Sequence, residues 1–311
     1  MDMSPFRTLV RTEGARLYRD LPWRRTRDPY EIWLSEVMLQ QTQVVRVESR
    51  WAEWLELFPS VFALAEATTA EVLSAWQGMG YNRRALALKS AAETIAQSYD
   101  GVFPSTLEEL VALPGIGPAT AQGIRSFAFD LPGVYLETNV RTVVLHHLFP
   151  DVPGVPDKEL IPIVRATCPE ASVEKVSGKP DEGATKGRPD IAYAVAQDDR
   201  DTPRSWYYAM LDYGAYLKKT VPNPSRRAKA YSRQSRFEGS RRQKRAEVVR
   251  QLLDAGARGE ELDVCAIAAA LNEVEHRAGR SAVEMDQVAS ILADLSREGF
   301  CQERDGAWSI L

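Results

Sequence analysis

Apolar residues recur with helical spacing along most of this chain, and that periodicity predicts a mainly α-helical protein. Helices are expected over residues 5–21, 28–47, 48–58, 69–77, 83–99 and 106–112, and again from Trp206 onwards. Short loops separate them, and Ser105-Thr106 with Glu109 three residues later is typical of a helix start. No strand-rich block precedes residue 295, and no internal repeat is evident.

The last segment has a different order of elements. Helical periodicity covers residues 242–253, 264–272 and 281–298, and two short alternating runs then flank Asp305-Gly306. An Asp-Gly pair between alternating runs is a strong signal for a β-hairpin. Three helices followed by a hairpin predict a winged-helix-like domain. Such a domain binds DNA or contacts protein, and the mixed charge of these helices favours neither.

Length and local composition suggest how the chain is divided. Residues 169–203 are rich in Pro, Gly, Asp, Lys and Ala and nearly lack large apolar residues, which predicts a flexible insertion. A length of 311 residues suits two domains. We therefore predict a first domain over residues 1–224, a basic linker over 225–241 and the winged-helix-like domain over 242–311.

Bulk composition excludes several classes of protein. A net charge of −4 and a pI of about 5.6 give no overall nucleic-acid signature, so any basic surface must be local. Cys168, Cys265 and Cys301 are far apart and form no C-x-x-C pair, so a disulfide framework, a zinc site and a four-cysteine iron–sulfur cluster are not expected. Scattered thiols, the lack of an apolar signal segment and the lack of a run of 18 apolar residues predict a cytoplasmic protein.

Residues 225–245 form a local basic stretch. Lys and Arg occupy positions 226, 227, 229, 233, 236, 241, 242, 244 and 245, whereas Glu238 is the single acid. A basic stretch is often only a solvated face. Because this one joins two predicted domains, we favour contact with nucleic-acid phosphates. The candidate contacts are Arg226, Arg227, Arg241 and Arg242.

Residues 113–121 are typical of a tight turn between two helices. Gly115 and Gly117 allow positive φ and close backbone approach, and Pro118 suits the first turn of the next helix. Free N–H groups at that helix start would bind a phosphate. Glu137, about 20 residues further on, is expected to face the same space. The alternative is a plain helix–helix turn followed by a surface acid.

Residues 28–44 carry the clearest candidate for an acid–base residue. At helical spacing Trp33, Val37 and Gln40 share one side, which leaves Glu36 at the edge of an apolar face. Burial there would raise the pKa of its carboxylic acid and make it a general acid near neutral pH. The alternative is an ordinary glutamate on a helix surface.

These segments resemble a known family in five ordered motifs. Residues 28–44 are similar to the catalytic helix of the MutY-type adenine DNA glycosylases, and residues 113–117 resemble the helix–hairpin–helix of the wider superfamily, which includes endonuclease III. The other similar segments are 78–84 to its minor-groove wedge, 135–143 to its catalytic loop, and 210–214 to the helix before its metal cluster. The resemblance covers roughly residues 5–217 and is interrupted by the insertion.

The resemblance implies a helix–hairpin–helix (HhH-GPD) glycosylase fold and hydrolysis of an N-glycosidic bond in double-stranded DNA, as in base excision repair. By position, Glu36 would donate a proton to the base, Glu137 would stabilise the positive sugar, and Asn139 would orient these groups. The target base must leave the stack, and a wedge from the protein would fill the duplex. The residues implied in DNA binding are Gln40, Gln41, Thr42, Met79, Tyr81, Arg83, Gly115 and Gly117.

Four features depart from the family pattern. Glu137 replaces the usual Asp, and the additional methylene moves the charge by about 1.5 Å. Ala119 stands where bifunctional relatives carry a Schiff-base lysine and MutY relatives carry Tyr or Ser, which implies a monofunctional enzyme that lacks one base-pocket contact. Lys218 stands where the first cluster cysteine would fall. The winged-helix-like segment replaces a Nudix-like domain that helps recognise 8-oxoguanine.

The sequence therefore leads to one main hypothesis and two alternatives. The main hypothesis is a monomeric, nucleoid-associated glycosylase that removes adenine mispaired with 8-oxoguanine or guanine, without a cofactor beyond, at most, a monovalent cation at the hairpin. Glu137 and Ala119 motivate the first alternative, a glycosylase for another base such as mismatched uracil or thymine. The second is a non-catalytic lesion-binding protein, which the presence of Glu36 disfavours.

Overall fold

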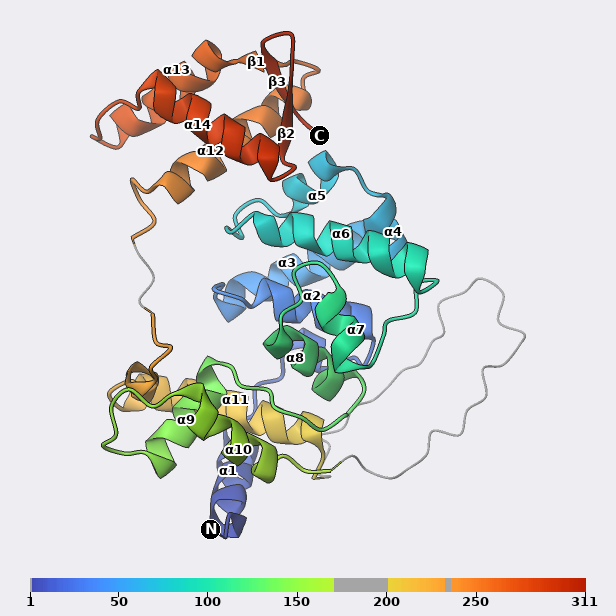
Figure 1. The fold of residues 1–311 in the computed structure, drawn as a ribbon, viewed down its shortest axis with the longest axis vertical. Coiled ribbons are helices and arrows are strands. Elements are labelled where there is room, and N and C mark those ends of the chain that lie inside the picture. Colours follow the sequence, from blue (N-terminus) through green and yellow to red (C-terminus); the bar gives the residue numbers. More distant parts are fainter. Residues whose placement is uncertain (1, 171–200, 233–235) are drawn as a thin grey trace. The chain divides into compact units, whose positions relative to one another are not determined.

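The computed structural model describes residues 2–170, 201–232 and 236–311, and Figure 1 shows its fold. The described residues are mainly helical, as the periodicity predicted. They form two compact units that alternate along the sequence. Unit 1 comprises Met1–Glu36, Ser105–Ala112 and Ile116–Ser232, and unit 2 comprises Val37–Pro104, Leu113–Gly115 and Arg233–Leu311. Most of the predicted insertion, residues 171–200, lies outside the described residues.

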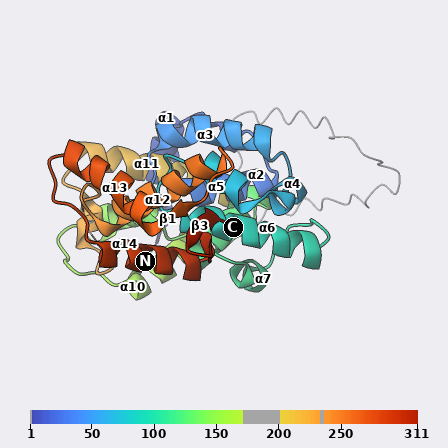
Figure 2. The same ribbon diagram turned by 90° about the horizontal axis from the view of Figure 1, so that it is seen from above.

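Unit 1 consists of helices around one apolar core. Its elements are α1 (Ser4–Arg16), η1 (Pro22–Arg24), most of α2 (Pro29–Met38), α7 (Leu107–Ala112), α8 (Pro118–Ala128), α9 (Thr138–Leu148), α10 (Asp157–Thr167), α11 (Pro203–Thr220) and η2 (Pro224–Arg227). α11 packs against α1, α8 and α9, and its contact with α1 can be followed in Figure 1 and Figure 2. Phe127, Trp206 and Tyr207 are fully buried in this core. α1 ends at Arg16, before the predicted end at residue 21.

A buried ion pair fixes α11 against the chain that leads into α2. Arg24 donates to Asp212 through Nη1 to Oδ2 at 2.7 Å and through Nη2 to Oδ1 at 2.8 Å, and neither side chain is accessible to solvent. The guanidinium also lies 4.3 Å from the ring centre of Tyr208. Removing one partner of such a pair leaves a buried charge and typically costs about 3–5 kcal/mol. The pair therefore joins the segment before α2 to the motif at residues 210–214.

The first part of unit 2 is also helical. It contains α3 (Val44–Leu57), α4 (Val61–Glu66), α5 (Thr69–Ala75) and α6 (Arg83–Ser98), and α6 packs against α4 and α5. The rings of Trp54 and Trp76 meet edge to face at 5.5 Å between ring centres. α4 was not predicted, because six residues carry too little periodicity to be recognised.

The rest of unit 2 contains three helices followed by a β-hairpin, the order that the sequence predicted for the winged-helix-like domain. Its elements are α12 (Arg241–Gly256), β1 (Leu262–Asp263), α13 (Val264–Arg277), α14 (Met285–Arg297), β2 (Cys301–Arg304) and β3 (Ala307–Ile310). β3 is the central strand and pairs antiparallel with β1 and β2. The predicted hairpin turn is confirmed, because Asp305 has φ of 51° and Gly306 has φ of 83°, as a tight turn of this type requires. The two-residue strand β1 was missed.

The predicted continuous helix over residues 28–47 is wrong. α2 ends at Met38, α3 starts only after a turn, and Gln41 within that turn has φ of 58°. The guanidinium of Arg84 donates to the carbonyl oxygens of Met38 at 3.1 Å and Gln40 at 2.6 Å. These carbonyls would bond to the next helical turn if the helix continued. The break therefore comes from a residue that is distant in sequence.

Neither a membrane helix nor a metal cluster is found in the part of the chain that the structure describes. None of its helices is long and apolar enough to cross a membrane. Within residues 2–170, 201–232 and 236–311, no three His, Cys, Asp or Glu side chains gather so that they could hold a metal ion. The expected lack of a cofactor remains a prediction.

Candidate active site

Glu36 lies near the end of α2, in unit 1, beside buried apolar residues. Trp33 and Val37 are almost inaccessible to solvent, whereas Glu36 is half-buried. Its Oε2 accepts a hydrogen bond of 3.0 Å from the hydroxyl of Tyr135. Burial raises the pKa of Glu36 to about 8, with a contribution from the negative charge of Glu137, although the Tyr135 hydrogen bond acts in the opposite direction. At neutral pH this carboxyl is therefore mostly protonated, as a proton donor must be.

Gly123 in α8 leaves the space that the carboxyl group of Glu36 fills. A β-carbon built on Gly123 would lie 2.1 Å from Oε2 of Glu36 and 3.0 Å from Cε2 of Tyr135. Both distances are shorter than a van der Waals contact allows. The backbone of α8 therefore approaches this carboxyl closely only because the residue has no side chain.

Glu137 caps the N-terminus of α9 with its own side chain. Its Oε1 accepts hydrogen bonds from the backbone N–H groups of Asn139 at 2.5 Å and Val140 at 2.9 Å. Burial raises the pKa of Glu137, while these amides and the positive charge of Lys218 lower it. The helix dipole also favours a negative charge at this end. The start of α9 thus holds the carboxylate of Glu137 at a defined position.

Asn139 is held by the same helix start and by α11. Its Nδ2 lies 3.4 Å from Oε2 of Glu137, and its Oδ1 is buried without a hydrogen-bond partner among the described residues. A β-carbon on Gly214 would lie 2.2 Å from the carbonyl oxygen of Asn139, so α11 touches this turn directly. The close approach fixes the backbone that carries Glu137 and Asn139.

The structure thus places the three predicted catalytic residues in unit 1, together with Tyr135, a neighbour that the sequence reasoning did not single out. Tyr135 was seen only as part of a loop, yet its hydroxyl contacts Glu36. The one signal that could have found it is its spacing of two residues from Glu137. Residues i and i+2 of an extended segment point to the same side, and the backbone at Glu137 is extended.

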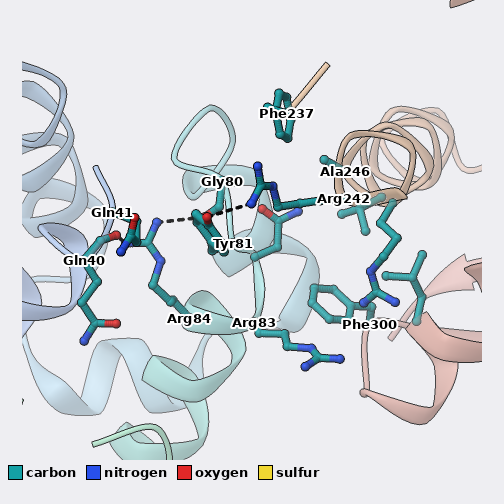
Figure 3. Close-up of a pocket in the computed structure, with 14 residues that line it drawn as sticks. Gln40, Gln41, Gly80, Tyr81, Arg83, Arg84, Phe237, Arg242, Ala246 and Phe300 are labelled. Carbon is teal, nitrogen blue, oxygen red and sulfur yellow. Dashed lines mark hydrogen bonds between the residues drawn. The ribbon is translucent and has the colours of Figure 1, made fainter. Parts of the chain in front are cut away.

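Five of the predicted DNA-contact residues of unit 2 line a pocket of about 390 Å³ (Figure 3), namely Gln40, Gln41, Tyr81, Arg83 and Arg242. The turn after α2 provides Gln40 and Gln41, and the turn before α6 provides Tyr81, which has φ of 50°. Arg84 links the two turns, because it also donates to the carbonyl oxygen of Gly80 at 3.0 Å. The two turns therefore form one rigid edge.

The winged-helix-like domain forms the other wall of this pocket. Arg242 of α12 donates a hydrogen bond of 2.8 Å to the hydroxyl of Tyr81, and its guanidinium lies 5.0 Å from the ring centre. Phe237, Arg245 and Phe300 also line the pocket. Its walls thus combine aromatic rings, guanidinium groups and side-chain amides, a composition suited to nucleobases.

Several predicted contacts of unit 2 are engaged within the protein, including Arg83 of the pocket wall. Thr42 accepts a hydrogen bond from Arg84 at 3.1 Å, Met79 is buried, and Arg83 binds the carboxylate of Glu298. Their contacts with DNA remain predictions.

The hairpin is partly as expected. Gly115 has φ of 71°, and a β-carbon there would lie 2.5 Å from Cβ of Ala87. Gly117 does not use the positive φ that glycine allows, because this residue is the extended N-cap of α8 with φ of −84°. Pro118 is the first residue of α8, as predicted.

The four candidate arginines of the basic stretch belong to two different units. Arg226 is exposed on η2, and Arg227 donates to the carbonyl oxygen of Leu145 at 2.8 Å, both within unit 1. In unit 2, Arg241 binds Asp294 at 2.6 Å, and Arg242 binds the Tyr81 hydroxyl as described above. Contact of these four residues with DNA remains a prediction.

Comparisons with known proteins identify the family of this chain. Residues 34–191, about half of the chain, match the family described as HhH-GPD superfamily base excision DNA repair protein. The chain is 46% identical over 145 residues to the adenine DNA glycosylase of Mycolicibacterium smegmatis, covering 46% of this chain and 49% of that protein. It is 41% identical over 168 residues to that of Mycobacterium tuberculosis, covering 51% and 55%. The chain thus spans about half the length of the curated relatives it matches.

The fold has a similar solved structure as well. A thermostable thymine-DNA glycosylase matches 69% of this chain and 88% of its own, with a TM-score of 0.52 and 20% sequence identity. At this identity the similarity concerns the fold alone. The family match over about half of the chain shows that the chain belongs to the HhH-GPD superfamily of base excision DNA repair proteins.

Proposed function

We propose that this chain is a monofunctional DNA glycosylase that hydrolyses the N-glycosidic bond of adenine mispaired with 8-oxoguanine or guanine. The observation that carries the proposal is a pair of carboxyl groups with different environments. Glu36 is a carboxylic acid whose pKa is raised to about 8, and Glu137 is a carboxylate held by backbone amides at a helix N-terminus. Glycosidases use such a pair for two separate tasks.

The two carboxyl groups divide the reaction between the base and the sugar. Breaking the bond between the sugar and the base leaves positive charge on the sugar and negative charge on the departing base. Glu36 gives its proton to a ring nitrogen of the base, so the base leaves neutral. Glu137 stabilises the oxocarbenium ion until water adds to the sugar and gives up a proton to the Glu36 carboxylate. A fixed anion in a water-poor site is effective for this stabilisation. Asn139 helps to hold the Glu137 carboxylate.

The base reaches the site only if it leaves the duplex. The turn that carries Tyr81 is the candidate wedge, and an inserted side chain offsets the cost of unstacking by contacts with the base left behind. The aromatic ring and the left-handed backbone of Tyr81 on a rigid turn support this role. The hairpin at Gly115 would contact phosphates.

Two further features concern what the enzyme does not do. Ala119 has no amine that could form a Schiff base, so strand cleavage by that route is not expected. Lys218 occupies the position of a cluster cysteine, and its charge acts on Glu137 instead. We therefore propose that the enzyme acts as a monomer on double-stranded DNA without an iron–sulfur cluster.

A panel of duplexes tests the proposal. Each duplex carries one mispair, namely adenine opposite 8-oxoguanine, adenine opposite guanine, uracil opposite guanine or thymine opposite guanine, and released base is measured in single turnover. Release of adenine alone, without strand cleavage, is expected. Preferential release of uracil or thymine would instead support the alternative that Glu137 and Ala119 motivate. Tight binding without release from any duplex would support a lesion-binding protein.

A further inference from the structure

Tyr135 is held rigidly beside Glu36 by its aromatic neighbours. Its ring meets those of Phe127 at 5.2 Å and Tyr207 at 5.3 Å, both edge to face. Its backbone N–H donates to the hydroxyl of Tyr207 at 3.1 Å, and that hydroxyl in turn donates to the carbonyl oxygen of Gly133. Ring and backbone are therefore both fixed, and the Tyr135 hydroxyl has little freedom to leave Glu36.

The partner oxygen on Glu36 is equally constrained. Gly123 leaves a gap in α8 that Oε2 fills, since any β-carbon there would lie 2.1 Å away. In that gap Oε2 accepts the Tyr135 hydrogen bond of 3.0 Å. The two oxygens of the carboxyl are thus not equivalent, because Oε2 accepts the hydrogen bond from Tyr135.

We propose that Tyr135 is a positioning residue for the catalytic acid. Its hydroxyl donates a hydrogen bond to Oε2 of Glu36, which leaves the acidic proton on Oε1, and from Oε1 the proton passes to the departing base. The proposal rests on the proposed function and assigns a role to a residue outside the catalytic set expected from the sequence. It also gives Gly123 a function, which is to keep the place of Oε2 open.

The charge balance of the site supports this arrangement. The Tyr135 hydroxyl keeps its own proton, because burial and the negative charges of Glu36 and Glu137 raise its pKa well above the ordinary value. As a donor it stabilises the carboxylate that remains after Glu36 has given up its proton. The other titratable groups that face Glu36 are Glu137, from the loop before α9, and Tyr208 of α11. Neither of them donates a hydrogen bond to Glu36 in the described structure.

Tyr135→Phe removes the hydroxyl and keeps the ring. A hydrogen bond to a charged group has a strength that corresponds to about a 10- to 100-fold change in rate, so we expect single-turnover base release to fall by about that factor. Without the donor the carboxylate is less stable, so the pKa of Glu36 rises further. The loss of activity at alkaline pH should therefore move to higher pH than in the wild type.

Tyr208→Phe is the matched control. It deletes a hydroxyl from the same aromatic cluster, stacked on Phe127 at 4.5 Å, and that hydroxyl has no hydrogen-bond partner among the described residues. The rate of base release by this variant, and the alkaline limb of its pH–rate profile, should match those of the wild type. Gly123→Ala is the second variant, because its β-carbon must displace Oε2, so a large loss of base release is expected.

The outcomes separate this inference from the proposed function. A wild-type protein that releases no base would contradict the function itself. If the wild type is active, a Tyr135→Phe variant with an unchanged alkaline limb would overturn the role of Tyr135, whether or not its rate falls, because a merely structural role would not move that limb. A shifted limb in Tyr135→Phe and an unshifted limb in Tyr208→Phe would support it.

Discussion

Changing Glu137 to Gln or Asp separates the charge of this side chain from its length. Oε1 lies 2.5 Å and 2.9 Å from two backbone nitrogens of α9, so the carboxylate is held by the helix start. Gln keeps the length and loses the charge, and loss of one group that stabilises the transition state typically costs about 10²–10³-fold in rate. Asp keeps the charge but draws it back by about 1.5 Å, and even ~1 Å of misplacement can cost about 10²-fold. Both variants should therefore lose at least about 10²-fold.

Single-turnover base release from the same mispaired duplex compares the two variants with the wild type. Melting temperature is the control, because Asp is itself a preferred N-cap and Gln retains an acceptor oxygen, so neither change should unfold α9. Full activity of Glu137→Gln would remove this residue from the catalytic set. Wild-type activity of Glu137→Asp would show that the pocket is not adapted to the longer side chain.

Three other predictions concern protonation, charge and colour. Base release should decline as the pH rises through about 8, because Glu36 donates a proton only in its acid form and burial raises its pKa to about 8; a pH–rate profile that stays level through this range would contradict the acid role. Changing Arg226, Arg227, Arg241 and Arg242 together to Gln should weaken binding to damaged and undamaged duplexes alike. It should also reduce the log–log salt slope by roughly 0.9 for each phosphate that the variant no longer binds, whereas an unchanged slope would leave the stretch a solvated face. The purified protein should show no absorbance band at about 400 nm, and stoichiometric iron and sulfide in the folded protein would refute this.

Features that depend on neighbouring residues were predicted well from the sequence. The hairpin at Asp305-Gly306 follows from two residues that tolerate positive φ. The start of α7 follows from Thr106 and Glu109, whose mutual hydrogen bonds are present in the structure. Glu36 was expected at the edge of an apolar face, and it is half-buried there. Each of these inferences needs only local spacing.

Features that depend on distant residues could not be read from local patterns. Residues 39–43 are acceptable helix formers, yet the helix ends there because Arg84 donates hydrogen bonds to the carbonyl oxygens of Met38 and Gln40. The hydrogen bond from Tyr135 to Glu36 spans 99 positions of sequence, and the gap at Gly123 exists only once α8 lies against that carboxyl. The spacing of residues along a single helix cannot predict these contacts.

Glu36→Gln tests the central claim most directly. Its amide keeps the size of the side chain but cannot deliver the proton, and general acid catalysis typically contributes about 10²–10⁴-fold. With a duplex that carries adenine opposite 8-oxoguanine, single-turnover release should fall by at least about 10²-fold, while a gel shift shows duplex binding close to that of the wild type. Release within about tenfold of the wild type would contradict the assignment of Glu36 as the proton donor and, with it, the proposed mechanism.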